Sequence, residues 1–420
     1  MPPTQGTATR AGVELAFKEG IEALNKGLLA DAEQCFRHAL AVEPNHLNAQ
    51  LQLGQLLAKM LRVEEAEPLL RRVREARPDL AITHHAHGSV LSVLNRMDEA
   101  EAALGEASRL DPEWQLAQGD LSELKAARES VSGNVGGPVK RQDLKRWPIL
   151  MNEFADLSAA ARHFVLDNDQ GQRFTVDDSS RFFTLGSCFA ANLADSLKAL
   201  GRPTTLFPYP EEINSTFANR YLLEWALGDL DDHELSAFFD GEFGGITSQQ
   251  FSSSMAAADV VIFTVGVAPC FFDRETGRFV LPRASSVSLW AQDNLFRTTS
   301  VAENVENLFA IIESVRRINP TVHIVLTISP VPLKATLEMS SVIQADAISK
   351  STLRVAVHEI MQREILGLSY WPSFEIVRWL GIYFEETFGG DDGRSRHVSG
   401  KVVDVIIRLF LEYYGNEPKQ

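Results

Sequence analysis

The stretch RFFTLGSCFAANLADSLKALG, residues 181–201, decides the fold of the second half of the chain. Its apolar start, up to Leu185, predicts a buried strand, and the spacing of Leu193 and Leu197 predicts a helix directly after it. A serine at this junction, Ser187, projects from the carboxyl end of a strand toward a helix N-terminus, where backbone N–H groups favour negative charge. Such a position suits a nucleophile. An N-capping serine without chemistry fits the pattern equally well.

Around this stretch, short apolar runs alternate with helical patterns, as expected for β-α units stacked on a mostly parallel sheet. The run VVIFTV, residues 260–265, has no polar alternation and predicts a central strand that is covered on both faces. We expect helices at 303–318, with Thr299 or Ser300 as N-cap, and at 402–413. The other expected strands are 181–185, 204–207, 323–328 and 374–377.

The first part of the chain contains an internal repeat. Gly20, Gly54 and Gly88 are spaced by 34 residues, and four further positions recur with the same period: Ala32, Ala66 and Ala100; Phe36, Leu70 and Leu104; Ala39, Val73 and Ala107; Pro44, Pro78 and Pro112. This pattern resembles the tetratricopeptide (TPR) repeat, a helical hairpin whose small residues let two helices approach closely. The resemblance covers about residues 12–112, and 113–130 is predicted to be a capping helix.

Between the two parts the composition shifts to Ser, Gly, Asn and Pro with a small basic run, SGNVGGPVKRQDLKR, which predicts a linker. We therefore expect a helical repeat domain at 12–130, with three repeats and a cap, a linker at 131–146 and an α/β domain at 147–415. TPR arrays usually bind a protein or peptide partner in a concave groove, which the resemblance implies here. Bracing of the next domain or self-association are the alternatives.

Composition excludes several classes of function. The chain has 420 residues and a formal charge of -16, which argues against a nucleic-acid partner. No apolar run is long enough for membrane insertion. Three widely spaced cysteines, Cys35, Cys188 and Cys270, suit neither a disulfide framework nor a zinc site, and they fit a reducing, cytoplasmic location. We expect no cofactor and no metal, and interpret the histidines near residue 85 as packed or solvated.

The string GSCFA, Gly186 to Ala190, resembles the signature of the GSCFA family, which is similar to the SGNH (GDSL-like) hydrolases. Further stretches fit that family: INST at 213–216, TVG at 264–266, TISPVPLKAT at 327–336, SKSTLR at 349–354, YWPSFEIV at 370–377 and DDGRSRHVS at 391–399. The resemblance covers roughly 147–415. It implies a three-layer α/β/α domain of the SGNH type and chemistry that depends on a serine.

Carried over by motif, the resemblance makes Ser187 the nucleophile and His397 the base that takes and returns its proton. The acid that orients the histidine usually stands three residues before it, where this chain has Arg394. Asp392 and Asp391 are the candidates. We favour Asp392, because the chain can loop back through a glycine, and an acidic turn facing solvent is the alternative.

The expected oxyanion hole also departs from the SGNH pattern. Gly266 is present, but Ala268 stands where an asparagine donor is usual. Asn214 could supply a side-chain donor instead, although N-capping of the helix at 215–227 suits it equally well. Cys188 is a weaker candidate nucleophile. Lys350 and Arg354 could meet an anionic substrate group, but a solvated helix face fits them better.

These features predict a serine-dependent acyl-ester hydrolase or O-acyltransferase, whose substrate the SGNH resemblance suggests to be acetyl groups on a glycan or glycan precursor. The repeats would recruit a protein partner or present the substrate. The alternative is a non-catalytic binding scaffold, built from the repeats and a degenerate SGNH-like domain. Phosphoester or sulfoester chemistry on the same serine is a third hypothesis.

Overall fold

The computed structural model describes residues 5–132, 146–166, 174–186, 188–208, 210, 213–242, 245–281 and 291–415. The chain divides into two compact units, Met1–Met151 and Asn152–Gln420. Most of the expected linker, residues 133–145, lies outside the described part of the chain.

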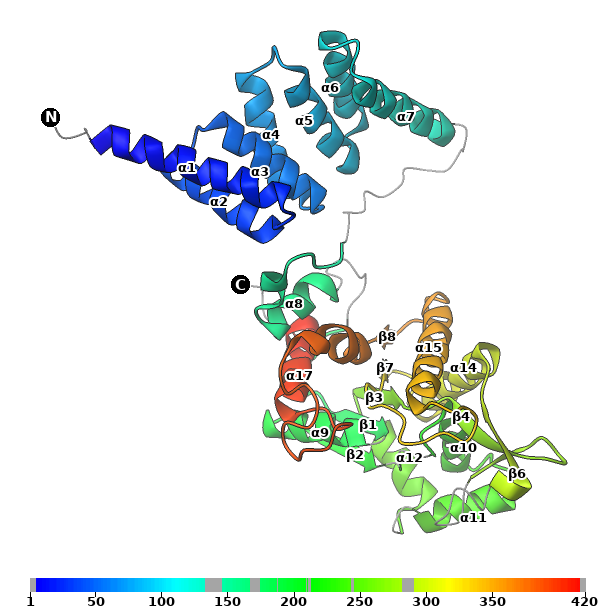
Figure 1. The fold of residues 1–420 in the computed structure, drawn as a ribbon. Helices are drawn as coiled ribbons and strands as arrows, with labels where there is room; N and C mark the ends of the chain where they lie inside the picture. The colour runs from blue at the N-terminus through cyan, green and yellow to red at the C-terminus, as the bar shows by residue number, and fades with distance from the viewer. Residues whose placement is uncertain are drawn as a thin grey trace. The chain divides into compact units, whose positions relative to one another are not determined.

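The first unit consists of three helical hairpins and a final helix, coloured blue to teal in Figure 1. The hairpins pair α1 with α2, α3 with α4 and α5 with α6, and α7 packs on α6. Each second helix ends two residues before the repeated proline, which lacks an N–H. The bounds are α1 Gln5–Asn25, α2 Leu29–Val42, α3 Leu47–Lys59, α4 Val63–Ala76, α5 Ala81–Val93, α6 Met97–Leu110 and α7 Gln115–Ser132.

The repeated glycine lies where the two helices of a hairpin touch. A Cβ added at Gly54 would lie 2.6 Å from the Leu70 side chain, and one at Gly88 would lie 2.9 Å from Leu104. Gly20 meets Phe36 in the same way, at 2.6 Å. The close helix approach inferred from the sequence is therefore confirmed.

A ladder of ion pairs follows the same period and joins neighbouring repeats. Arg62 donates to Glu33 of the preceding repeat at 2.8 Å and to Glu65 at 2.7 Å. One repeat later, Arg96 donates to Glu67 at 3.0 Å and to Glu99. The pairs that join neighbouring repeats, Arg62 with Glu33 and Arg96 with Glu67, are partly buried, so they contribute more than exposed pairs do. These ion pairs were not predicted, because only the apolar positions of the repeat were compared.

The turn between the two helices of each hairpin needs a left-handed residue. This position is Gly27 in the first repeat, Leu61 in the second and Asn95 in the third, with φ values of 74°, 56° and 56°. Glycine and asparagine adopt this conformation readily, whereas leucine pays a steric penalty because its Cβ crowds the following carbonyl.

We predict that Leu61→Asn raises the free energy of unfolding by about 1 kcal/mol, because it relieves the left-handed strain. Little packing is lost, since Leu61 is 43% exposed. Urea unfolding followed by circular dichroism measures the change. Leu15→Asn, at an exposed leucine inside α1, is the matched control and should be neutral or destabilising. Equal effects of the two substitutions would contradict the prediction.

The second unit is built on a five-stranded, all-parallel sheet in the order β2-β1-β3-β7-β8. The bounds are β1 Phe182–Gly186, β2 Thr204–Pro208, β3 Val260–Val265, β7 His323–Ile328 and β8 Leu368–Tyr370. In chain order this is the doubly wound arrangement 2-1-3-4-5, in which the winding direction reverses between β1 and β3. Ligands bind such sheets at the carboxyl ends of the strands beside this switch point.

Helices cover both faces of the sheet, as Figure 1 shows. Alternate residues of β3 enter two separate cores: Val261 and Phe263 pack with α10, α12, α14 and α15, while Val260 and Ile262 pack with α8, α9 and α17. The expected three-layer α/β/α architecture is present. The helices are α8 Leu157–Phe164, α9 Cys188–Ala199, α10 Thr216–Leu227, α11 His233–Glu242, α12 Ser248–Ala256, α14 Val301–Ile318, α15 Val342–Met361 and α17 Gly400–Tyr414.

Two details differ from the sequence interpretation. A small antiparallel sheet, β5-β4-β6, was not predicted; its strands are β4 Pro269–Asp273, β5 Phe279–Val280 and β6 Asn294–Thr298. The strand expected at 374–377 is wrong, because these residues form α16, Ser373–Glu375, and a π-helical turn, Ile376–Leu380. Pro372 favours the start of a helix, and the fifth strand, β8, precedes it. Ile376 and Val377 are buried, as residues of a central strand would be, but they belong to a helical turn.

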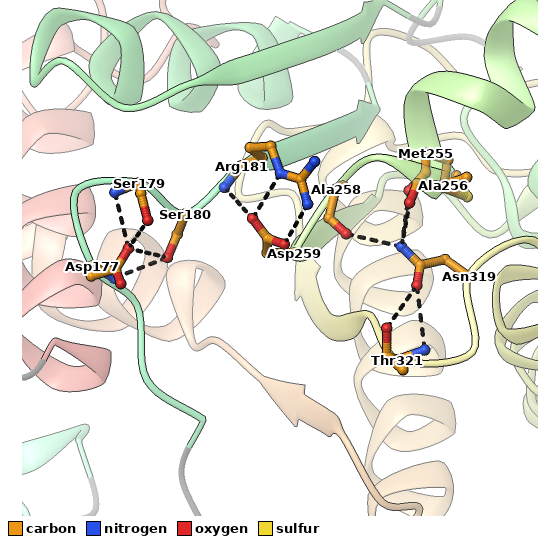
Figure 2. Close-up of polar contacts among 10 residues, drawn as sticks. All are labelled: Asp177, Ser179, Ser180, Arg181, Met255, Ala256, Ala258, Asp259, Asn319 and Thr321. Atoms are coloured by element: carbon orange, nitrogen blue, oxygen red, sulfur yellow. Dashed lines mark hydrogen bonds and ion pairs between the residues drawn. The ribbon is translucent and has the colours of Figure 1, made fainter.

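The amino ends of the strands are closed by polar contacts, shown in Figure 2. Arg181 and Asp259, which precede β1 and β3, form a two-pronged ion pair with N···O distances of 3.0 and 2.8 Å. Asn319 Nδ2 donates to the carbonyls of Met255, Ala256 and Ala258 at 2.9 to 3.3 Å and so caps the end of α12. These contacts are structural, and they leave the opposite edge of the sheet for chemistry.

His323, at the start of β7, gives this unit a pH dependence. Burial, together with the charge of Arg316, lowers its pKa from 6.5 to about 4. The ring stacks on Phe174 at 3.5 Å, and Nε2 lies 2.9 Å from Ser369 Oγ. Between these two pKa values the unfolded chain binds a proton that the folded chain does not. Stability is therefore fully present above pH 6.5 and falls as the pH drops toward 4.

We predict that acidification from pH 7 to 4.5 lowers the free energy of unfolding of the second unit by about 2 kcal/mol through His323, allowing for its partial exposure. In His323→Gln, which does not titrate, this part of the loss disappears. Urea unfolding at the two pH values measures it. The same loss in wild type and variant would refute the assignment.

Candidate active site

The strand–helix junction lies where the sequence predicts it. β1 ends at Gly186 and α9 begins at Cys188, so a single residue, Ser187, connects them. Ser187 itself lies outside the described residues. Gly186 has a φ of +145°, and a Cβ there would lie 2.8 Å from Thr264 Cβ and 3.1 Å from Ala190 Cβ. Only glycine fits this turn, which brings the chain into the helix close against β3.

The structure separates the two aspartates that the sequence left as candidates. Asp392 Oδ2 lies 2.7 Å from His397 Nδ1, whereas Asp391 Oδ2 accepts the backbone N–H of Gly400 at 2.6 Å. The chain turns between Asp392 and His397 at Gly393, which has a φ of 71°. Asp392 therefore contacts the imidazole, and Asp391 caps α17.

Local hydrogen bonds keep Asp392 ionised. The backbone N–H of Arg394 donates to Asp392 Oδ1 at 2.9 Å, and this bond, followed by the contact with His397, lowers the pKa of the carboxyl group. The side chains of His397 and Asp392 are 34% and 39% exposed, so a substrate can reach the imidazole from solvent. An ionised carboxylate at Nδ1 leaves Nε2 as the atom that accepts a proton.

Hydrogen bonds to backbone carbonyl groups place the His397 loop near the carboxyl edge of the sheet. Arg396 donates from Nε and Nη2 to the carbonyl of Pro332, at 2.9 and 2.7 Å. Ser329, in the same segment after β7, donates its N–H to Val265 of β3 at 2.8 Å. The loop that carries His397 is thus hydrogen-bonded to the segment that follows β7. That segment is in turn hydrogen-bonded to the end of β3. The neighbouring strand, β1, ends at this edge one residue before Ser187.

The two expected oxyanion residues contact each other. The backbone N–H groups of Gly266 and Val267 donate to the carbonyl of Asn214, at 3.2 and 2.9 Å. Asn214 is fully buried, and its Nδ2 donates to Thr264 O at 3.1 Å. It does not cap α10, because Ser215 does so by accepting the N–H of Ala218. The structure thus brings Gly266 and Asn214 together, with their donors engaged inside the protein.

Two basic residues are placed differently from the expected solvated helix face. Lys350 is 2% exposed, and its Nζ donates to the carbonyl of Gly266 at 2.6 Å. Arg354 donates to Glu375 at 2.6 Å and lies over the ring of Tyr370. For Lys350 the expectation of a solvated face was wrong, because α15 is covered by the loop after β3 at this point, whereas the Arg354 side chain is 36% exposed.

The remaining candidates are weaker. None of the three cysteines forms a disulfide; Cys188 is exposed, and burial raises the pKa of Cys270 to about 12, which keeps that thiol protonated. Within the described ranges, no group of three or more His, Cys, Asp and Glu side chains is arranged to hold a metal ion. His85 pairs with Asp120 and His87 with Glu67. No helix in the described part of the chain has the length and apolarity to cross a membrane.

Comparison with protein families agrees with the division of the chain into a helical repeat unit and an α/β unit. Residues 243–410 match the GSCFA family, and residues 23–85 match the tetratricopeptide repeat. The chain carries a GSCFA domain and tetratricopeptide repeats. Gly266, Lys350, Asp392 and His397 lie inside the residues matched to GSCFA, whereas Ser187 and Asn214 precede them. No curated protein matches the chain.

Solved structures similar to part of this chain include TPR proteins. MamA residues 41-end from Desulfovibrio magneticus RS-1 is 25% identical, with 29% of this chain and 68% of that chain covered and a TM-score of 0.28. The first TPR domain of human RPAP3 is 14% identical, with 29% and 97% covered and a TM-score of 0.28. The Arabidopsis OM64 TPR domain is 15% identical, with 28% and 98% covered and a TM-score of 0.27.

We predict that Asp391→Ala lowers the free energy of unfolding of the GSCFA domain by about 1 kcal/mol, because α17 loses the acceptor at its N-terminus. Asp391→Asn, which keeps an oxygen acceptor, should lose less. Urea unfolding of the three proteins measures this. Unchanged stability in Asp391→Ala would show that the Gly400 contact does not hold the helix.

Proposed function

We propose that the protein is a serine-dependent acyl-ester hydrolase or O-acyltransferase. The observation that carries the proposal is the 2.7 Å contact between His397 Nδ1 and Asp392, in a loop tethered to the carboxyl edge of a doubly wound sheet. β1 ends at the same edge, one residue before Ser187 in the chain. The proposed nucleophile thus follows one strand of the edge where such sheets bind ligands, and the base and its orienting acid share a second segment, the loop tied to that edge.

In the proposed reaction, Ser187 Oγ attacks the ester carbonyl while His397 Nε2 takes the hydroxyl proton. Asp392 holds the imidazole in the correct tautomer and stabilises its protonated form. Collapse of the tetrahedral intermediate releases the alcohol, which receives the proton from His397, and leaves an acyl-serine. Water or a sugar hydroxyl, deprotonated by His397, then attacks the acyl-serine and regenerates the enzyme.

The substrate and partner are proposed on the family resemblance. SGNH-like chemistry favours an O-acyl group, such as acetyl on a glycan or glycan precursor. The TPR array is compatible with protein partner binding, and we propose that it recruits a partner that brings or receives the substrate. Three free cysteines suit a reducing, cytoplasmic compartment.

A binding scaffold is the second candidate, and the oxyanion region favours it. Both strand-end N–H groups, of Gly266 and Val267, donate to Asn214 O, so both already have an acceptor inside the protein. Ala268, fully buried, has no side-chain donor where SGNH enzymes have asparagine. Losing one oxyanion donor typically costs about 3 kcal/mol in the barrier, so a domain that lacks several would bind without turning over.

The proposal is tested by labelling the full-length protein with a fluorophosphonate probe and by following p-nitrophenyl acetate hydrolysis. We expect both rates to fall at least about a thousandfold in Ser187→Ala and His397→Ala, and about a hundredfold in Asp392→Ala. Asp391→Ala is the matched control, since it removes the adjacent carboxylate without touching the imidazole. Its rates should stay within about threefold of wild type.

Circular dichroism of each variant confirms that it is folded. Equal rates in wild type and all variants would overturn the enzyme proposal and favour the scaffold. Labelling without ester turnover, tested on a panel that includes phosphate and sulfate esters, would keep the nucleophile and redirect the search for the substrate.

A further inference from the structure

Two consecutive residues of α15 hold the segment that follows β3. The N–H of Ala268 donates to Ser349 Oγ at 3.0 Å, and Lys350 Nζ donates to Gly266 O at 2.6 Å. Ser349 and Lys350 are 0% and 2% exposed. The carboxyl end of β3 is therefore fixed by side chains from a helix, at the point where the sheet pairing of this strand ends.

Burying the ammonium group of Lys350 in this space is energetically unfavourable. Removing a charge from water costs free energy that an apolar side chain of similar length, such as methionine, does not lose. Packing alone therefore does not account for a lysine here. The contact with Gly266 gives the charge a local role, because a cation at a carbonyl oxygen makes a stronger hydrogen bond than a neutral donor.

The effect passes to Asn214 through one peptide group. The Gly266 carbonyl and the Val267 N–H belong to the same peptide, and that N–H donates to Asn214 O at 2.9 Å. A cation at the carbonyl polarises the peptide and strengthens its N–H as a donor. Asn214 is also held by its own side chain, which donates to Thr264 O and accepts from Asn219 Nδ2 at 3.1 Å each.

We propose that Ser349 and Lys350 are positioning residues of the candidate active site. Together they form a clamp on residues 266–268 and, through the Gly266–Val267 peptide, fix Asn214 beside the end of β3. The catalytic part of this inference rests on the proposed function, because a clamp at this edge sets the geometry in which Ser187 reacts. The clamp itself does not depend on it.

The test uses full-length Lys350→Met, which keeps the length and removes the charge, and Lys350→Arg, which keeps the charge. Lys198→Met, at an exposed lysine near the end of α9, is the control. We expect amide hydrogen exchange in a peptide covering 264–270 to be about tenfold faster in Lys350→Met, with no change in a peptide covering α17. Lys350→Arg should restore part of the protection.

Fluorophosphonate labelling should slow about ten- to hundredfold in Lys350→Met, with partial rescue in Lys350→Arg and no change in Lys198→Met. Exchange at 264–270 equal to wild type in Lys350→Met would overturn the clamp. Faster exchange with unchanged labelling would overturn its role in the site. If wild type is not labelled at all, the proposed function fails, while the exchange data still decide the clamp.

If Lys350→Met does not fold, Ser349→Ala replaces it. This substitution removes the acceptor for Ala268 N–H and keeps the lysine. Faster exchange at 264–270 would support the clamp, and unchanged exchange would overturn it.

Discussion

At Gly186 the chain passes from β1 into α9 in a space that no other residue can occupy. A Cβ at this position would overlap Thr264 on the neighbouring strand. The close pairing of β1 with β3 and the position of α9 therefore depend on a residue without a side chain. Because the winding of the sheet reverses between these two strands, the segments that follow them open onto the same crevice. Every other part of the candidate site is placed relative to this junction.

The apolar pattern predicted much of the fold because burial leaves a strong mark on sequence. The strands at 260–265 and 323–328 follow from uninterrupted apolar runs, and the helix at 303–318 follows from its apolar stripe and a possible N-cap at Thr299 or Ser300, of which the structure uses Ser300. The prediction of a strand at 374–377 was wrong for the same reason. Ile376 and Val377 are buried in a helical turn, and four residues are too few for their apolar pattern to distinguish such a turn from a strand.

Polar contacts were harder to predict, because they depend on which segments meet in space. The choice between Asp391 and Asp392 was open in the sequence, and only the turn at Gly393 and the start of α17 separate their roles. Lys350 was assigned to a solvated face because its helix was considered alone. Its cover is the loop after β3, some 80 residues earlier in the chain. The ladder of Arg62 and Arg96 was recoverable, since its charges recur with the repeat.

The two proposed functions, enzyme and binding scaffold, differ in whether the domain has hydrogen-bond donors that can stabilise an oxyanion. The peptide N–H groups after β3 are directed at Asn214, and Lys350 holds them there from the carbonyl side. A serine at a strand–helix junction has another source of donors, because the first turn of a helix presents backbone N–H groups that have no intrahelical acceptor. In an active enzyme, α9 would therefore stabilise the developing charge, and the rigid segment at 266–268 would serve to hold β3 and Asn214 in place beneath it.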